Sequence, residues 1–211
     1  MKYVSSFALA CAMTMAAPAM AVTTVSFSGA SGTLPSGTTI FQNFDGLAAG
    51  SSLGTNALVF DASVDGQAAR PAFGSTGNFG AVQTDGTYTV DFGPTNVFSF
   101  VLGSLDTYNS LTLRYEGGAS QTYAGGQIIN DLSFPSGNQI SGETNGVVTY
   151  RVTSGARIIG ATFTSSGNSF EFDNLASAAI PEPASWAMMI GGFALLGAAA
   201  RRRSRVISVS V

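Results

Sequence analysis

Two carboxylates near the end of the central region are the residues best placed for acid–base chemistry. Glu171 and Asp173 stand two positions apart in SFEFDN, where they alternate with Phe170 and Phe172. On a strand, this alternation puts both acids on one face, with their Cα atoms about 6.6 Å apart. That separation lies within the broad range used by glycosidase carboxylates. We instead expect a strand whose acidic face is solvated.

The region between Val22 and Ile180 lacks most other groups that catalysis uses. It contains no histidine, lysine or cysteine. A serine nucleophile would have no ordinary general base, and a transition metal would have no imidazole or thiolate ligand. We therefore predict that the protein is not an enzyme and needs no cofactor. Glycoside hydrolysis by Glu171 and Asp173 is the distant alternative.

Calcium is the one ion that the acids suit, because hard cations prefer carboxylate and carbonyl oxygens. Asp45 in NFDG and Asp173 in FEFDNL are the candidate ligands, whereas DASVDG at 61–66 lacks the alternating ligands of an EF-hand loop. In architecture, the region resembles jelly-roll modules that bind sugars and often hold a structural calcium through an acid of the final strand. This resemblance implies a candidate structural Ca²⁺ bound by Asp45 and Asp173.

An aromatic platform for stacking sugar rings would have to use tyrosine, because the central region has no tryptophan. Two of its tyrosines fall on the apolar faces of predicted strands, so we expect them in the core. These two are Tyr115 and Tyr150, and the other candidates are Tyr88, Tyr108 and Tyr123.

The elements that position these residues are predicted to be short strands. In SLTLRY at 110–115 and VVTYRVT at 147–153, apolar and polar residues alternate with the period of a strand. The segments between such runs contain turn-forming dipeptides. Further candidate strands lie at 39–44, 57–64, 87–92, 96–102, 157–163 and 168–174, and the turn signals are Asp65-Gly66, Asp85-Gly86, Gly117-Gly118 and Asn145-Gly146.

Roughly ten strands at intervals of about 8–15 residues predict an all-β fold, an antiparallel β-sandwich of jelly-roll type. Residues 96–102, NVFSFVL, are almost continuously apolar. We therefore expect this strand to be central and covered on both faces.

The net charge of the central region argues against nucleic acid as a partner. Between Val22 and Ile180 the chain has eleven acidic residues and four arginines, a net charge of −7. A nucleic-acid-binding domain needs a basic surface, so we predict no nucleic-acid partner.

The N-terminus has the order of a secretory signal peptide. Lys2 precedes an apolar stretch that ends in the small-x-small sequence Ala19-Met20-Ala21. We predict cleavage after Ala21. Cleavage would remove Cys11, the only cysteine, so the exported domain would be held by its core alone.

The C-terminus predicts a single transmembrane helix. Residues 184–200 carry no charge and would span about 25 Å as a helix. The arginine cluster at 201–205 would stay on the cytoplasmic side, with the domain outside. Ile180 and Glu182 each precede a proline, so the segment before the helix is predicted to be extended and readable by an enzyme.

This tail resembles the PEP-CTERM sorting signal of Gram-negative bacteria, in its PEPxxWA subgroup. The matching positions are Pro181, Glu182, Pro183, Trp186 and Ala187, followed by MMIGGF and by Arg201, Arg202 and Arg203. The resemblance implies processing by an exosortase, a membrane-embedded cysteine transpeptidase, and delivery to the cell surface. The central region is also similar to sandwich domains that often precede this tail and have no known activity.

The predicted organisation is a signal peptide at 1–21, a β-sandwich domain at 22–177, a sorting signal at 178–205 and a short tail at 206–211. Within the sorting signal, the motif is 181–187, the helix 184–200 and the arginine cluster 201–205. We predict export through the inner membrane, transient membrane anchoring, then a surface or extracellular location. Two functions stay open for the domain, a structural role in the cell surface or biofilm matrix and binding of exopolysaccharide.

Overall fold

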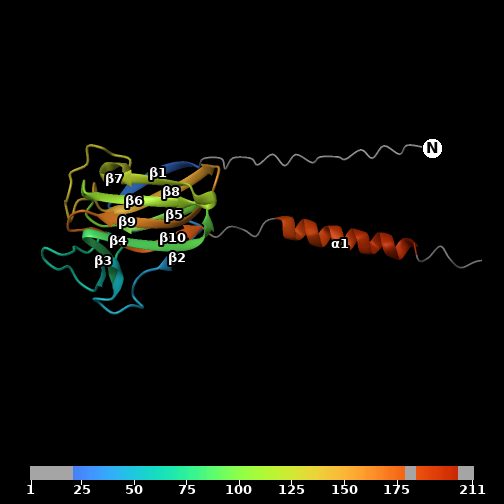
Figure 1. The fold of residues 1–211 in the computed structure, drawn as a ribbon, viewed down its shortest axis with the longest axis horizontal. Helices are drawn as coiled ribbons and strands as arrows, with labels where there is room; N and C mark the ends of the chain where they lie inside the picture. Colours follow the sequence, from blue (N-terminus) through green and yellow to red (C-terminus); the bar gives the residue numbers. More distant parts are fainter. Residues whose placement is uncertain (1–20, 179–183, 204–211) are drawn as a thin grey trace, which may run out of the picture.

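The computed structural model describes residues 21–178, which we call the β domain, and residues 184–203, where side chains are described only at 189–197 and 201 (Figure 1). The β domain contains ten strands and two short 3-10 helices, and residues 184–203 form one α-helix. In chain order the elements are β1 Val22–Gly29, β2 Thr38–Gln42, β3 Ser52–Phe60, β4 Phe79–Thr95, β5 Val97–Leu102, β6 Asn109–Tyr115, η1 Glu116–Gly118, β7 Ser120–Ala124, η2 Gly125–Ile128, β8 Gly146–Ser154, β9 Ile158–Ser165, β10 Phe170–Ala178 and α1 Ala184–Arg203.

The strands form one antiparallel sheet that curls back on itself. Its order is β1-β8-β5-β10-β4-β9-β6-β7, with β2 also paired to β10 and β3 also paired to β4. The half made of β1, β8, β5, β10 and β2 lies against the half made of β7, β6, β9, β4 and β3 (Figure 1). The antiparallel all-β prediction is thus confirmed. The two separate sheets of the predicted sandwich are instead two halves of one continuous sheet.

Strand β4 is long because it passes from one half of the sheet to the other. Near its start, Gly80 pairs with Phe172 of β10, whereas its later residues from Gly86 onward pair with β9. Opposite β3, the strand bulges between Val82 and Thr87, and Asp85 there has a φ of 54°. The turn predicted at Asp85-Gly86 is therefore wrong, because this dipeptide bends the strand at a bulge without ending it.

The remaining predicted strands are found, and two further strands form the two edges of the sheet order. Gly117 and Gly118 have φ values of 81° and 87° and connect β6 to β7, as a turn there requires. β5 is buried at every residue, between β8 and β10, so its predicted central position is confirmed. The two strands that were not predicted are β1 and β7, the terminal strands of the sheet order.

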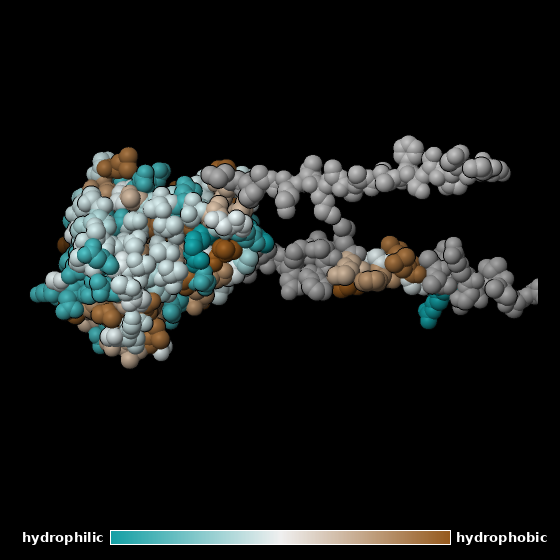
Figure 2. Space-filling model, viewed as in Figure 1, coloured by the Kyte–Doolittle hydropathy of each residue, from teal (hydrophilic) through white to brown (hydrophobic). Residues whose placement is uncertain are grey.

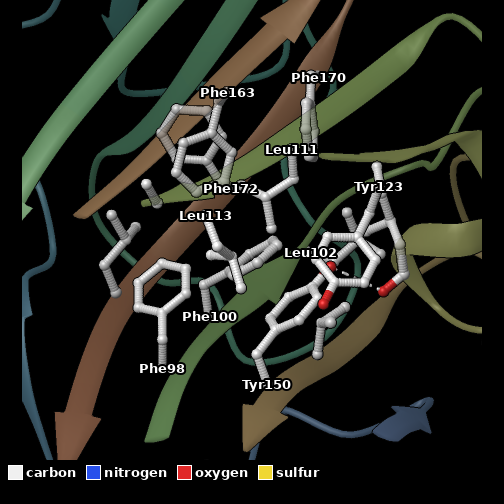
Figure 3. Packing of buried hydrophobic residues seen from close by; sticks show 14 of the residues in the cluster. Phe98, Phe100, Leu102, Leu111, Leu113, Tyr123, Tyr150, Phe163, Phe170 and Phe172 are labelled. Carbon is white, nitrogen blue, oxygen red and sulfur yellow. Dashed lines mark hydrogen bonds between the residues drawn. The ribbon is translucent and has the colours of Figure 1, made fainter. Parts of the chain in front are cut away.

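Aromatic rings from both halves of the sheet form the core (Figure 3). The ring of Phe172 on β10 lies 4.2 Å from that of Phe163 on β9, measured between centroids, and 5.4 Å from the ring of Tyr88 on β4. Phe100 on β5 meets Phe163 edge to face at 5.2 Å. The Phe172 ring also covers Gly80, where an added Cβ would lie only 2.5 Å from it. These contacts hold the curled sheet closed.

A row of threonines crosses the outer face of one half of the sheet. Thr89, Thr162, Thr112 and Thr122 are successive cross-strand partners on β4, β9, β6 and β7. Their hydroxyls pair at 3.1 Å between Thr89 and Thr162 and at 2.8 Å between Thr112 and Thr122. Figure 2 shows that the face in view is mostly of intermediate hydropathy. This side of the domain is thus polar but largely uncharged.

Phe172→Ala should lower the free energy of unfolding by about 3–5 kcal/mol, because it removes a ring that contacts both halves of the sheet. Urea unfolding followed by tyrosine fluorescence measures the change. Leu132→Ala is the matched control, since Leu132 is 82% exposed and its removal should cost less than about 0.5 kcal/mol. A similar loss in both variants would contradict the central role of this ring.

Candidate functional site

The two acids of β10 are buried, which corrects the prediction of a solvated acidic face. Glu171 is 2% exposed and Asp173 is fully buried. Phe170 and Phe172 point into the core, as the alternation predicts, and the acids point to the outer face of the strand. Their burial therefore requires another part of the chain to cover this face.

The connection at 61–78, between β3 and β4, provides this cover. The backbone N–H of Ala69 donates to Glu171 Oε1 at 2.9 Å, and Ser75 Oγ donates to Asp173 Oδ2 at 2.7 Å. Arg70 holds the connection together, because its two terminal nitrogens donate to the carbonyls of Asp61 and Gly77. Its guanidinium carbon also lies 5.0 Å from the ring centroid of Phe79.

Glu171 lies at the inner wall of a cavity of about 320 Å³. The residues that line this space come from four parts of the chain: residues 63–69, then Ser104, Asp106 and Tyr108, then Gly137 and Gln139, and finally Asn168, Ser169 and Glu171. Besides the bond from Ala69, Glu171 accepts hydrogen bonds from the hydroxyls of Ser169 and Ser104, the latter at 3.3 Å. The carboxyl group is thus fixed in place by three donors from three different segments.

Tyr108 and Asn168 hold the walls of the cavity together. The Tyr108 hydroxyl donates to the backbone carbonyl of Asn168 at 2.5 Å, and Asn168 Nδ2 donates to the carbonyl of Gly66 at 2.8 Å. Asn168 Oδ1 accepts from the backbone N–H of Thr84 at 2.9 Å. The cavity therefore has walls that are preorganised by hydrogen bonds between distant parts of the chain.

Burial shifts the pKa values of two groups that line the cavity, Glu171 and Tyr108. It raises the pKa of the Glu171 carboxyl, and the donors at Ala69 and Ser169 oppose this shift only in part. The pKa of Tyr108 is also raised, first by burial and then by the nearby Asp106. Burial thus disfavours the ionised forms of Glu171 and Tyr108.

Asp173 does not share this cavity, so the two acids do not act on one space. Asp173 accepts from Ser75 and, at 2.7 Å, from the backbone N–H of Asn174. Burial raises its pKa to about 6, and the negative charge of Asp45 adds to this shift. The structure therefore brings the two predicted calcium ligands into one neighbourhood, apart from Glu171.

The neighbourhood of Asp45 and Asp173 does not fit a calcium site as it stands. Asp45 accepts at both oxygens, from the backbone N–H of Asn78 at 2.8 Å and from Asn43 Nδ2 at 2.9 Å. Asp173 also accepts at both oxygens. Over residues 21–178 and 184–203, no three acidic, histidine or cysteine side chains gather at one place. Calcium takes six to eight oxygen ligands, so binding would require these donors to be displaced.

Only one candidate tyrosine borders the cavity. Tyr108 is half-buried and lines it. Tyr115 and Tyr150 lie in the core, as predicted, with exposed fractions of 2% and 0%. Tyr88 and Tyr123 are also buried in the core. No local pattern in the sequence distinguishes Tyr108, because the segments that surround it are distant in the chain.

The predicted sorting residues lie largely outside the described part of the chain. Pro181, Glu182 and Pro183 are outside it, as is Ala19 of the predicted cleavage site, whereas Ala21 packs against the core. Trp186, Ala187, Arg202 and Arg203 belong to α1, of which only the backbone is described at these positions, and Arg201 is exposed.

Helix α1 begins at Ala184, as predicted, and ends at Arg203, three residues beyond the predicted end. Its described apolar side chains include Ile190, Phe193 and Leu195, which are 67%, 67% and 74% exposed. Among the described residues, no helix has the length and apolar character needed to cross a bilayer. The predicted membrane span is therefore not confirmed.

Comparison with known proteins gives one match, which lies in the tail. The family model of the PEP-CTERM protein-sorting motif matches residues 179–203. This match confirms the resemblance given by Pro181, Glu182 and Pro183, and it indicates export and sorting. No curated protein and no solved structure matches the chain.

The raised pKa of Asp173 predicts that mild acid stabilises the protein. The folded state binds this proton more tightly than the unfolded state, whose pKa is near 3.8, so the free energy of unfolding should rise as the pH falls from about 6 to about 4. Asp173→Asn should reduce this slope and gain on the order of 1 kcal/mol at pH 7. Urea unfolding across this pH range measures both.

Asp61→Asn is the control for this pH series, because Asp61 is exposed and belongs to the same connection. It should leave the slope as in the wild type. Glu171 acts in the same direction as Asp173, so part of the slope should persist in Asp173→Asn. A wild-type protein that loses stability steadily below pH 6 would contradict the raised pKa values of these two buried acids.

Millimolar calcium should change the melting temperature by less than about 2 °C relative to EDTA, because protein donors already occupy the oxygens of Asp45 and Asp173. Differential scanning calorimetry provides the measurement. A rise of more than about 5 °C that is lost in Asp45→Ala and kept in Asp61→Ala would instead establish a structural calcium.

Proposed function

We propose that this chain, which carries a PEP-CTERM protein-sorting motif, is an exported protein that an exosortase processes for the cell surface or extracellular matrix. The observation that carries this proposal is the boundary between the two parts of the chain. Strand β10 ends at Ala178, and the matched motif begins at residue 179. A cut within the motif would therefore leave every strand of the β domain intact.

The N-terminal boundary of the β domain supports the same proposal of export and processing. Strand β1 begins at Val22, immediately after the predicted signal-peptide site at Ala21. Removal of residues 1–21 would leave all eight residues of β1 paired with β8. Both processing events would thus release a domain that keeps all ten of the strands described for residues 21–178.

Membrane contact of the tail before processing is part of this proposal. Exosortases act within the membrane, so the tail must reach it. The exposed side chains of Ile190, Phe193 and Leu196 on α1 would gain from transfer out of water. The arginines that follow would remain at the charged surface of the cytoplasmic leaflet.

For the β domain itself, we propose a non-catalytic role as a surface or matrix component. The threonine row across β4, β9, β6 and β7 supports this role, because its hydroxyls can donate and accept hydrogen bonds without carrying a charge. The absence of histidine, lysine and cysteine from the central region argues in the same direction. The separation of Glu171 from Asp173 argues against this carboxylate pair as a glycosidase centre.

A second candidate function is binding of carbohydrate, such as an exopolysaccharide of the surface layer. The observation that favours it is the hydrogen-bonding cavity beside Tyr108 and Glu171. Sugar sites combine an aromatic wall with amide, hydroxyl and carboxyl groups that match the donors and acceptors of the ring hydroxyls.

Processing predicts a defined mass for the protein recovered from the surface or medium of its native host. We expect a chain that begins at Val22 and ends within residues 180–183, with or without an added group. Intact-mass spectrometry measures this directly. Glu182→Ala should block processing and leave the tail attached, because it removes the charge at the centre of the motif.

Glu143→Ala is the matched control, since Glu143 is an exposed acid of the β domain. It should be processed as the wild type is. A wild-type mass that runs from Val22 through Val211 would mean that the motif is not processed and would overturn the sorting proposal.

A further inference from the structure

We infer that the cavity beside Glu171 binds a single sugar unit of a non-anionic glycan. The sugar would enter at the end of the β domain that lies opposite Ala178, the last residue before the sorting motif. This inference rests on the second candidate function above, which it narrows to one site and one class of ligand. Four features of the cavity carry it, namely its size, its lining, its charge and its position.

The size suits a small ligand. A volume of about 320 Å³ lies at the lower limit of ligand-binding pockets in proteins. Glu171 closes its inner wall, and the exposed residues Gln67, Gln139 and Asn168 surround it. A ligand of one sugar ring fits such a space, whereas a chain of several rings would extend from it into solvent.

The lining offers the groups that sugar hydroxyls need. Gln67 and Gln139 each present an amide with both donors and acceptors, and Ser104 and Ser169 present hydroxyls. Glu171 already accepts from Ala69, Ser169 and Ser104, so it supports the hydroxyls that would meet the ligand. This arrangement favours a neutral ligand with many hydroxyls.

The charge of the lining excludes anionic ligands. Asp65 and Asp106 line the cavity, and none of its described lining residues is basic. A uronate or a phosphorylated sugar would bring a further negative charge close to these acids without a compensating cation. Neutral hexoses and amino sugars meet no such repulsion.

The position of the cavity keeps it open after sorting. Along β10, Glu171 and Ala178 are separated by about 23 Å, the length of seven residues on a strand. Val22 and Ala178 lie at the same end of the sheet, because β1, β8, β5 and β10 are in register there. The cavity loops lie at the opposite end (Figure 1). A domain attached through its C-terminus would thus present the cavity outward.

The test measures sugar binding to the full-length chain in a sugar-free zwitterionic detergent by saturation-transfer NMR. The probes are D-glucose, D-galactose, D-glucosamine and D-glucuronate. We expect at least one neutral or amino sugar to bind and glucuronate to bind more weakly. The double variant Gln67→Ala, Gln139→Ala should weaken binding about tenfold, because it removes two hydrogen-bonding side chains from an exposed rim.

Gln121→Ala is the matched control. Gln121 lines a separate groove of about 560 Å³ beside Thr23 and Thr122. It should leave binding unchanged. Asp65→Lys tests the charge argument, because a cation at the rim should raise the affinity for glucuronate relative to glucose.

The outcomes distinguish this inference from the function on which it rests. Sugar binding that survives the double variant, or that is lost in Gln121→Ala, would overturn the cavity assignment and leave carbohydrate binding intact. Tighter binding of glucuronate than of every neutral sugar would overturn the charge argument. Binding of none of the probes would overturn the inference of a site for a single sugar unit, whereas binding of a longer glycan elsewhere on the domain is a separate part of the carbohydrate-binding function.

Discussion

The β domain depends on the central position of its last strand. β10 pairs with β5 along one edge and with β4 and then β2 along the other, so it joins the two halves of the sheet. Its inner face supplies Phe170 and Phe172 to the core. Its outer face supplies Glu171 and Asp173, which the connection 61–78 covers. One strand thus organises the sheet, the core and the candidate site.

Burial of two carboxyl groups on this strand costs stability, because each loses hydration that protein donors replace only in part. The raised pKa values of Glu171 and Asp173 reflect that cost. The chain holds the covering segment in place with Arg70, which joins its two ends. Ionisable groups that are buried at a cost in stability are typical of binding sites. Here such burial accompanies a cavity at Glu171 and a hydrogen-bonded cluster at Asp173.

The candidate cavity and the last residue before the sorting motif lie at opposite ends of the β domain. The strands end at Ala178, the sorting motif follows at once, and the cavity loops lie at the far end of β10. This arrangement would separate the proposed processing of the tail from the proposed binding in the cavity. Removal of the tail would not disturb the packed core, and attachment through the C-terminus would not cover the cavity. The threonine row on β4, β9, β6 and β7 lies along the side of the domain, between these two ends.

Local patterns in the sequence determined the strand content and the sorting tail. Period-two alternation identified β6 and β8, and the order of Pro181, Glu182, Pro183 and the arginines identified the motif, because both signals depend only on neighbouring residues. Tertiary structure decided the rest. The more polar strands β1 and β7, the bulge at Asp85-Gly86 and the cover over Glu171 and Asp173 all depend on contacts between residues far apart in the chain. Alternation places the two acids on one face of β10, but only the folded connection 61–78 makes that face buried.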